Sequence, residues 1–156
     1  MTSVVAVAGT LIGSLTTYLF QRRTAERAEA VARRERLRQE RLAAYSGYAA
    51  AVTDLKRAKI TLWFRQRRSP RDEESLLAAL LESDRLGAAA ETAAFRLQLV
   101  ADDPQLRRLM EAVSAKVGEI THAEDRQAVI VIESGFEQAV RTFIDAAAGQ
   151  LREVSP

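Results

Sequence analysis

The feature that most constrains the fold is the uncharged opening segment. From Thr2 to Phe20 the chain has 19 consecutive residues without a charged side chain, and Arg22 and Arg23 follow at once. A transmembrane helix needs about 20 mostly apolar residues to cross a hydrocarbon core roughly 30 Å thick. A cleaved signal peptide would instead carry basic residues before its apolar segment and a small-residue cleavage site after it. The pattern therefore predicts a membrane-spanning anchor over residues 1–20.

The basic residues after this segment indicate its orientation. Because Arg and Lys accumulate on the cytoplasmic side of membrane proteins, we expect the N-terminus outside the cell membrane and the C-terminal body in the cytoplasm. Arg22, Arg23 and Arg27 lie within about two helical turns of the predicted headgroups. There each basic residue near an anionic leaflet contributes about 1 kcal/mol of attraction. We therefore predict that these three arginines contact lipid.

A pair of glycines inside the predicted span could bring two spans together. Gly9 and Gly13 form a GxxxG pair, and small residues at this spacing let two helix backbones approach closely in lipid. Glycine is also common in membrane helices for less specific reasons. Self-association through this face and an ordinary lipid-facing glycine pair therefore remain alternatives.

The rest of the chain predicts helices only. Residues 21–41 hold 8 arginines and 4 glutamates with few apolar residues, which is typical of a solvated juxtamembrane stalk. Residues 42–156 are expected to form a cytoplasmic antiparallel bundle of three or four helices. Its first helix continues the stalk and carries apolar residues at spacings of three and four, which predict a narrow packing stripe if Lys59 is set aside. These residues are Tyr45, Tyr48, Val52, Leu55 and Leu62.

Two proline-containing segments mark the helix boundaries of the predicted bundle. Ser69 is expected to cap a second helix with Pro70 at its first position, and that helix runs to about Ala101. At roughly 1.5 Å per residue, the second helix should fold back to about the level of Leu37. Asp103 before Pro104 predicts the start of a third helix.

The segment at residues 118–124 leaves the number of helices open. Gly118 and the capping-box pattern from Thr121 to Glu124 favour a break and a fourth helix, which we prefer. A continuous helix would leave Phe136 and Phe143 exposed unless a second chain covered them. A broken one would set the acidic residues of the last helix beside the arginine-rich stalk; these are Glu133, Glu137, Asp145 and Glu153.

Charge is divided unevenly along the chain. Residues 1–71 hold 15 basic and 5 acidic residues, a net charge of +10, and residues 72–156 hold 8 basic and 16 acidic residues, a net charge of −8; together these give the overall +2. Such a division indicates pairing between the two parts or with charged partners.

No residue pattern in the chain predicts catalysis, a cofactor or a small-molecule substrate. There is no cysteine, and the glycine-rich loops and nucleophile elbow of nucleotide-binding proteins and hydrolases are missing from the sequence. Glu119 and His122 have the Glu-x-x-His spacing of di-iron bundles, but His122 is the only histidine and such sites need two of these motifs. The acidic pairs at 73–74, 102–103 and 124–125 stand where helices are expected to begin. We therefore predict no catalytic and no metal site.

The segment from Trp63 to Arg71 combines an aromatic pair with basic residues. Its candidate contact residues for a protein partner or nucleic acid are Trp63, Arg65, Arg67, Arg68 and Arg71. The interpretation that we prefer is that Trp63 packs in the core and the arginines are solvated. A protein partner is the next alternative, and nucleic acid is the last.

The layout as a whole resembles the KilB-type plasmid spread proteins of actinobacteria. The resemblance rests on the opening VVAVAGTLIGSLTTYLF, the arginine-rich QRRTAERAEAVARRERLRQERLAAY that follows, and an all-helical remainder of matching length. It implies membrane association and a role in spreading conjugative plasmid DNA, and it implies no catalytic residues. The stator stalk of rotary ATPases has a similar layout, but its helix would not fold back at the two proline-containing segments.

These observations predict an all-α, single-pass membrane protein whose function is non-enzymatic. The predicted role is a scaffold or interaction protein at the membrane, assembled as a homo-oligomer and with other membrane or plasmid-transfer proteins. The alternative is a membrane-tethered nucleic-acid-binding protein that uses residues 65–71.

Overall fold

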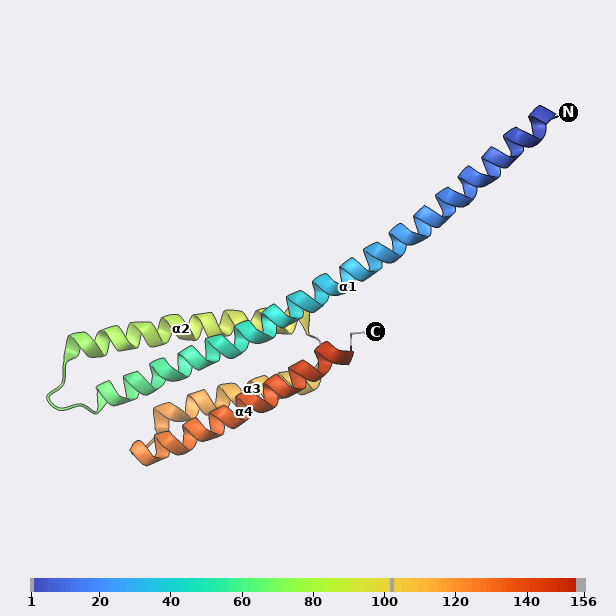
Figure 1. The fold of residues 1–156 in the computed structure, drawn as a ribbon. Coiled ribbons are helices and arrows are strands. Elements are labelled where there is room, and N and C mark those ends of the chain that lie inside the picture. Colours follow the sequence, from blue (N-terminus) through green and yellow to red (C-terminus); the bar gives the residue numbers. More distant parts are fainter. Residues whose placement is uncertain (1, 102, 154–156) are drawn as a thin grey trace. The chain divides into compact units, whose positions relative to one another are not determined.

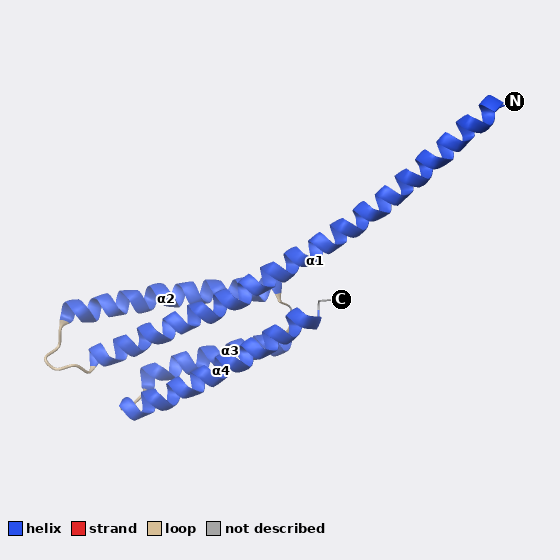
Figure 2. Cartoon of the chain, viewed as in Figure 1, coloured by secondary structure: helices blue, strands red, loops and turns tan. Residues whose placement is uncertain are grey.

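The protein is helical throughout the part of the chain that its structure describes. The computed structural model describes the backbone of residues 2–101 and 103–153, and the side chains of residues 21, 22, 25–101 and 103–152. Its elements are listed here in chain order: α1 (Thr2–Gln66), α2 (Glu73–Val100), α3 (Pro104–Glu119), the 3-10 helix η1 (Ile120–His122) and α4 (Arg126–Glu153) (Figures 1 and 2). No strand occurs within these described residues. The all-α prediction is confirmed.

The chain divides into two compact units between Gln39 and Glu40. The first unit contributes the N-terminal part of α1. The second unit, called the helical body below, contains the rest of α1 and the other helices. Within the helical body, successive helices run in opposite directions (Figure 1).

The start of α2 differs from the predicted cap. Asp72 is the N-cap, and its Oδ1 accepts a hydrogen bond from the backbone N–H of Ser75 at 3.2 Å. The prediction that Ser69 caps this helix is wrong, because Ser69 and Pro70 lie in the loop before it. A helix beginning at Pro70 would carry the positive charge of Arg71 in its first turn, where the helix dipole disfavours it. Starting at Glu73 places two carboxylates there instead.

The other two helix starts both use aspartate. Asp103 Oδ1 accepts a hydrogen bond from the N–H of Gln105 at 2.6 Å, and Pro104 is the first residue of α3, as predicted. Asp125 Oδ1 accepts from the N–H of Ala128 at 2.7 Å at the start of α4. The preferred break is therefore confirmed, but the capping box from Thr121 is wrong, because Thr121 lies inside η1.

One hydrophobic core receives residues from all four α-helices of the helical body. The rings of Tyr48 and Phe143 meet edge-on with centroids 5.2 Å apart, and Tyr45 contacts Phe143 in the same way at 6.4 Å. The buried members of this cluster are Tyr45, Tyr48, Val52, Ala90, Leu97, Ala101, Leu106, Met110, Val113, Val117, Phe136, Phe143 and Ala147. Both phenylalanines of α4 are thus buried by the chain itself.

The apolar stripe of α1 follows the prediction as far as Leu55, which is half-buried and packs against the core. Beyond it the buried face passes through Lys56 and Trp63, whereas Lys59 and Leu62 are half-buried. Lys56 Nζ donates a hydrogen bond to Glu133 Oε1 at 2.5 Å, so a buried ammonium takes a place that the pattern left to apolar residues. Trp63 belongs to a second cluster with Ile120, Ala123 and Val129.

The folded-back length of α2 agrees with the prediction to about one helical turn. Arg41 Nε donates a hydrogen bond to the backbone carbonyl of Val100 at 3.3 Å, so the C-terminal end of α2 lies beside Arg41. The expectation that the acids of α4 lie beside the arginine-rich segment is wrong for Glu133. Glu133 pairs with Lys56, and Glu137 pairs with Arg141 of its own helix at 3.8 Å.

Candidate interaction sites

The predicted membrane anchor lies outside the residues whose side chains the structure describes. This holds for the whole segment 2–20, including Gly9 and Gly13, and for Arg23. In the part of the chain with described side chains, no helix is both long enough and apolar enough to span a bilayer.

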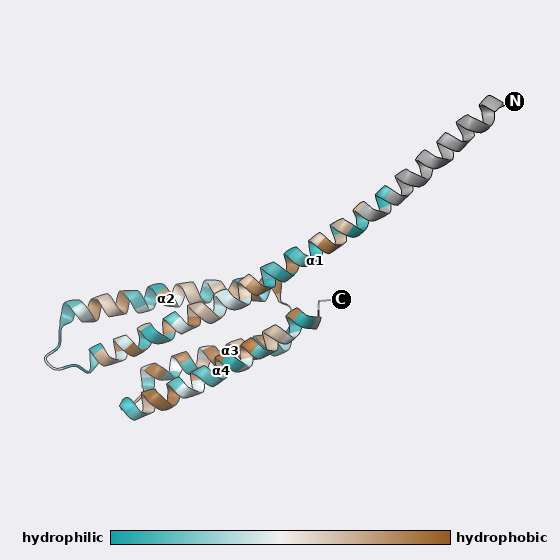
Figure 3. Ribbon diagram, in the orientation of Figure 1, coloured by the Kyte–Doolittle hydropathy of each residue, from teal (hydrophilic) through white to brown (hydrophobic). Residues whose placement is uncertain are grey.

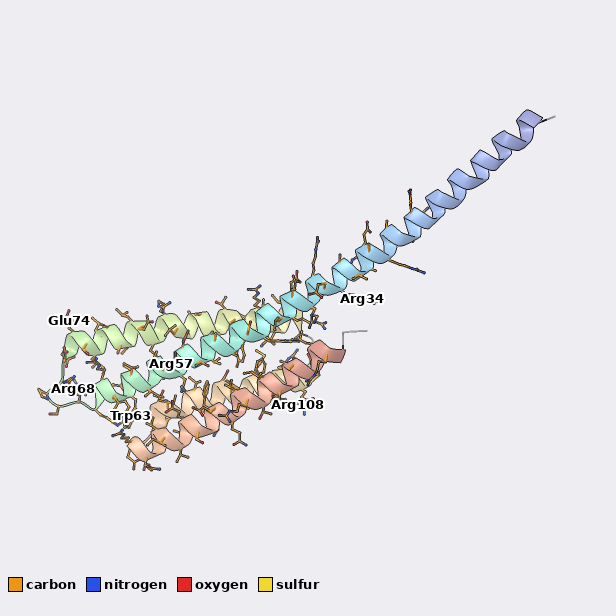
Figure 4. All side chains as sticks on the ribbon, in the orientation of Figure 1. Arg34, Arg57, Trp63, Arg68, Glu74 and Arg108 are labelled. Atoms are coloured by element: carbon orange, nitrogen blue, oxygen red, sulfur yellow. The ribbon has the colours of Figure 1, made fainter. Side chains whose placement is uncertain are left out.

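Among its described side chains, the arginine-rich segment, residues 21–41, exposes its charges except at Arg41, which is half-buried. Arg22 pairs with Glu26 at 3.0 Å, and Arg38 lies 3.8 Å from Glu35. These are the contacts at three and four residues that arginines and glutamates make along a helix, and each is worth only a few tenths of a kcal/mol when exposed. Figure 3 shows the hydrophilic character of the segment, and Figure 4 shows Arg34 on it. Arg27 is exposed as well, so its charge is available to an anionic surface.

Trp63 is a core residue. Its side chain is 5 % exposed, and its Nε1 donates a hydrogen bond to the backbone carbonyl of Ala123 at 2.9 Å. Arg67 Nη2 donates to the same carbonyl at 2.8 Å, and its guanidinium lies 4.2 Å from the centre of the Trp63 ring. Together they fasten the end of α1 to the turn between η1 and α4. The preferred interpretation, that Trp63 packs in the core, is thus confirmed.

The remaining arginines at this end of the body differ in how far they are engaged. Arg71 Nη2 donates to the backbone carbonyl of Gln66 at 3.3 Å. Arg65 is half-buried and Arg68 is exposed (Figure 4). Of the five predicted contact residues, only these last two have side chains without a hydrogen bond or ion pair among the described residues.

The residues with metal-ligand spacing do not form a site with each other. Both carboxylate oxygens of Glu119 accept hydrogen bonds from Lys116 Nζ, at 2.8 and 2.9 Å. His122 is exposed at the end of η1. Among the described residues, no three side chains of the types His, Cys, Asp and Glu are grouped so that they could hold a metal ion.

Open grooves run along the helical body between its described side chains. A groove of about 290 Å³ between α1 and α4 has an almost wholly apolar lining that includes Leu42, Phe143 and Ile144. A second, of about 460 Å³, lies between α1, α2 and α3 and is lined partly by Lys59 and Glu91. The third, of about 320 Å³ between α1 and α2, is lined mainly by small residues: Ala43, Ala44, Gly47, Ala89, Thr92, Ala93 and Arg96.

The outer side of α2 exposes several large apolar residues. Leu99 is 87 % exposed, and the other large apolar residues on this side are 56 to 60 % exposed: Leu77, Leu81 and Phe95. The leucines of this helix were not assigned to a face from the sequence, so this surface was not predicted. The signal was present, because the buried Ser83, Ala90 and Leu97 repeat every seven residues and leave the larger residues on the opposite side.

A scan against protein families matches residues 42–151 to the family described as KilB plasmid transfer protein. The chain belongs to this family. The resemblance stated from the sequence is thereby confirmed, and membership supports a role in plasmid transfer. No curated protein and no solved structure matches the chain.

The KilB match covers most of the helical body. It includes the core-forming part of α1, all of α2, α3 and η1, and α4 as far as Leu151. The outer face of α2 and the buried pair Lys56–Glu133 both lie inside the matched region, whereas the arginine-rich segment ends where the match begins.

Proposed function

We propose that this member of the KilB family is a non-enzymatic, membrane-anchored scaffold in plasmid transfer. Its helical body lies in the cytoplasm, and it assembles with further copies of itself and with other membrane or plasmid-transfer proteins. Family membership supports the part in plasmid transfer. The membrane attachment, the scaffold role and the partners are inferred from the residues.

The observation that carries the proposal is the uncharged segment 2–20 followed directly by arginines. Its length matches a bilayer crossing. The exposed Arg22 and Arg27 stand next to it and suit anionic headgroups. We propose that Gly9 and Gly13 contribute to pairing between spans.

The described titratable groups support a non-catalytic role. Burial raises the pKa of Tyr48, and a hydrogen bond with Ser114 lowers it by a smaller amount. The phenol donates a hydrogen bond to the backbone carbonyl of Met110 at 2.9 Å. Burial also raises the pKa of Tyr45. Shifted pKa values in active sites normally belong to paired acids and bases in a cleft. Here the two tyrosines are packed against Phe143 in the core.

Membrane fractionation of the full-length protein tests the anchor. Membranes are washed with high salt and then with alkaline carbonate, and the protein is followed in both fractions. We expect retention through both washes, because a spanning helix is held by its apolar residues and not by charge. Release by salt would mean that only the arginines bind lipid. Release by carbonate would mean that segment 2–20 does not span the bilayer, and the scaffold would lose its anchor.

A further inference from the structure

The outer face of α2 is a straight apolar ridge. Leu77, Leu81, Ala88, Phe95 and Leu99 are separated by four, seven, seven and four residues. At about 100° per residue these positions fall within roughly 40° of one another around the helix. All five are exposed. The inner face of α2 is already packed in the core through Ser83, Ala90 and Leu97, so the ridge has no partner within the described chain.

Charges of opposite sign border the two sides of this ridge. At the same angular spacing, Asp84 and Glu91 lie on one side, and Arg85 and Arg96 lie on the other. All four are exposed. Arg85 is also held by Glu82 through two hydrogen bonds of 2.7 Å, which offset part of its charge. Arg96 therefore carries most of the positive potential on its side.

We propose that α2 pairs in parallel with α2 of a second copy of this chain, ridge against ridge. In a parallel two-fold pair, the acidic side of each helix faces the basic side of the other. Glu91 then meets the partner's Arg96, five residues further along, which is the offset of flanking ion pairs in parallel coiled coils. An antiparallel pair would instead set acid against acid and base against base. The charge pattern thus selects both the partner and the orientation.

The size of the ridge indicates how the pair is held. Residues 77–99 span about 33 Å of helix, and a single helix face of that length is smaller than the roughly 800 Å² per partner of a standard interface. Such a pair is weak in dilute solution and gains from the high local concentration of tethered molecules. In this respect the inference rests on the proposed membrane anchor. A parallel pair also brings together the Arg41–Val100 ends of two bodies, as two chains attached to the same membrane require.

Cysteine crosslinking in the full-length protein tests the pairing, because the natural chain has no cysteine. Single variants Leu81→Cys, Ala88→Cys and Phe95→Cys are treated in membranes with a short bifunctional maleimide. Ala112→Cys, an exposed position on α3, is the matched control. We expect a crosslinked dimer at positions 81, 88 and 95 and none at 112. An antiparallel pair would instead give a dimer at position 88 alone among the single variants. It would also give crosslinks when Leu81→Cys chains are mixed with Phe95→Cys chains, and this combination would overturn the parallel orientation. No dimer at any of the three would overturn the interface.

A charge exchange tests the orientation independently. Glu91→Arg in the Ala88→Cys background should lower the crosslinked yield at least threefold, and adding Arg96→Glu should restore it. An unchanged yield in the first variant, or no recovery in the second, would contradict the flanking ion pairs. Carbonate washing of the same membranes separates the two proposals. If the protein stays in the membrane after the carbonate wash but does not crosslink, the pairing alone is refuted. If the protein is released by carbonate but still crosslinks, the anchor alone is refuted.

Discussion

Helices α2 and α4 have the same length, 28 residues each, but they use their large apolar residues in opposite ways. In α4 the two phenylalanines, Phe136 and Phe143, are both buried in the core. In α2 the one phenylalanine, Phe95, is 56 % exposed, while Ser83 and Ala90 are buried. The core of a single chain explains both phenylalanines of α4, although Ile130, Val131 and Ile144 of the same helix are 47 to 62 % exposed. It does not explain α2, whose largest apolar residues are explained by a second interface.

The two helices also differ in how they pack against α1; the contact of each with α1 is called its seam below. The seam with α4 contains ring contacts between Tyr45, Tyr48 and Phe143 and the ion pair of Lys56 with Glu133. The seam with α2 is lined mainly by alanine and glycine, and a groove of about 320 Å³ remains along it. Fewer large contacts mean a lower free energy of local opening. We therefore expect α2 to exchange its amide hydrogens faster than α4 in the absence of a partner.

The largest expected effect comes from truncating one phenylalanine in each helix. Phe143→Ala should lower the free energy of unfolding by about 3–5 kcal/mol, because it empties a fully buried ring position. Phe95→Ala, the matched change on α2, should lower it by less than about 1 kcal/mol, because the ring is largely exposed. Urea unfolding of the full-length protein in mild detergent, followed by helical circular dichroism, measures both.

The two phenylalanine variants should also differ in association. Phe95→Ala should reduce crosslinking through Ala88→Cys, since it removes part of the ridge. Equal losses of unfolding free energy at both positions would break the contrast between the helices, because Phe95 would then be a core residue.

Much of the fold could be predicted from the sequence, for identifiable reasons. Aspartate before proline specifies the start of α3, and the heptad-like positions of Tyr45, Tyr48 and Val52 specify the core face of α1. The start of α2 was misplaced because Ser69 and Asp72 are both good caps. What decides between these two caps is that a helix capped by Ser69 would place Arg71 in its first turn. This is a weaker sign of where a helix begins than Pro70, which favours a start at residue 70.

The candidate sites were harder to predict because their residues act through distant parts of the chain. Trp63 and Arg67 share the carbonyl of Ala123, and nothing in a segment of alternating aromatic and basic residues indicates such a distant acceptor. Lys56 breaks an apolar pattern, and its partner Glu133 is 77 residues away. The ridge of α2 was missed because the number of leucines in a helix does not show which of its apolar faces packs in the core and which is exposed.

The second prediction concerns the buried ion pair on the α4 side. Glu133→Ala should lower the free energy of unfolding by about 1–3 kcal/mol, since it leaves the ammonium of Lys56 buried without a carboxylate and with only the Phe136 ring, 5.5 Å away, beside it. The loss is smaller than for a fully buried pair because the Glu133 side chain is 39 % exposed. Lys56→Met, which fills the same space without a charge, should change stability by no more than about 1 kcal/mol. A larger loss in Lys56→Met than in Glu133→Ala would show that the pair itself stabilises the seam.

The third prediction is a pH dependence from the tyrosines. Because burial raises the pKa of Tyr48, the folded chain holds the phenolic proton more tightly than the unfolded chain, whose tyrosine pKa is about 10. This stabilisation is complete below about pH 10 and is lost as the pH rises through the folded-state pKa. Tyr48→Phe should cost about 1 kcal/mol at pH 7 through the lost hydrogen bond to Met110. The difference from the natural protein should shrink above pH 10 in urea unfolding. A difference that stays constant to pH 11 would show that the pKa of Tyr48 in the folded chain is not raised above its unfolded value.

The smallest expected effect, and the only gain, is on the inner face of α2. The hydroxyl of Ser83 is 1 % exposed and has no hydrogen-bond partner among the described residues. A buried hydroxyl without a partner is destabilising, so Ser83→Ala should raise the free energy of unfolding by up to about 1 kcal/mol. Ser46→Ala is the control, because its exposed hydroxyl bonds to the carbonyl of Leu42 and its removal should change stability little. If Ser83→Ala were destabilising by as much as Tyr48→Phe, the hydroxyl would have a partner in solution. The inner face of α2 would then be held by a polar contact, and its weak packing against α1 would no longer distinguish it from α4.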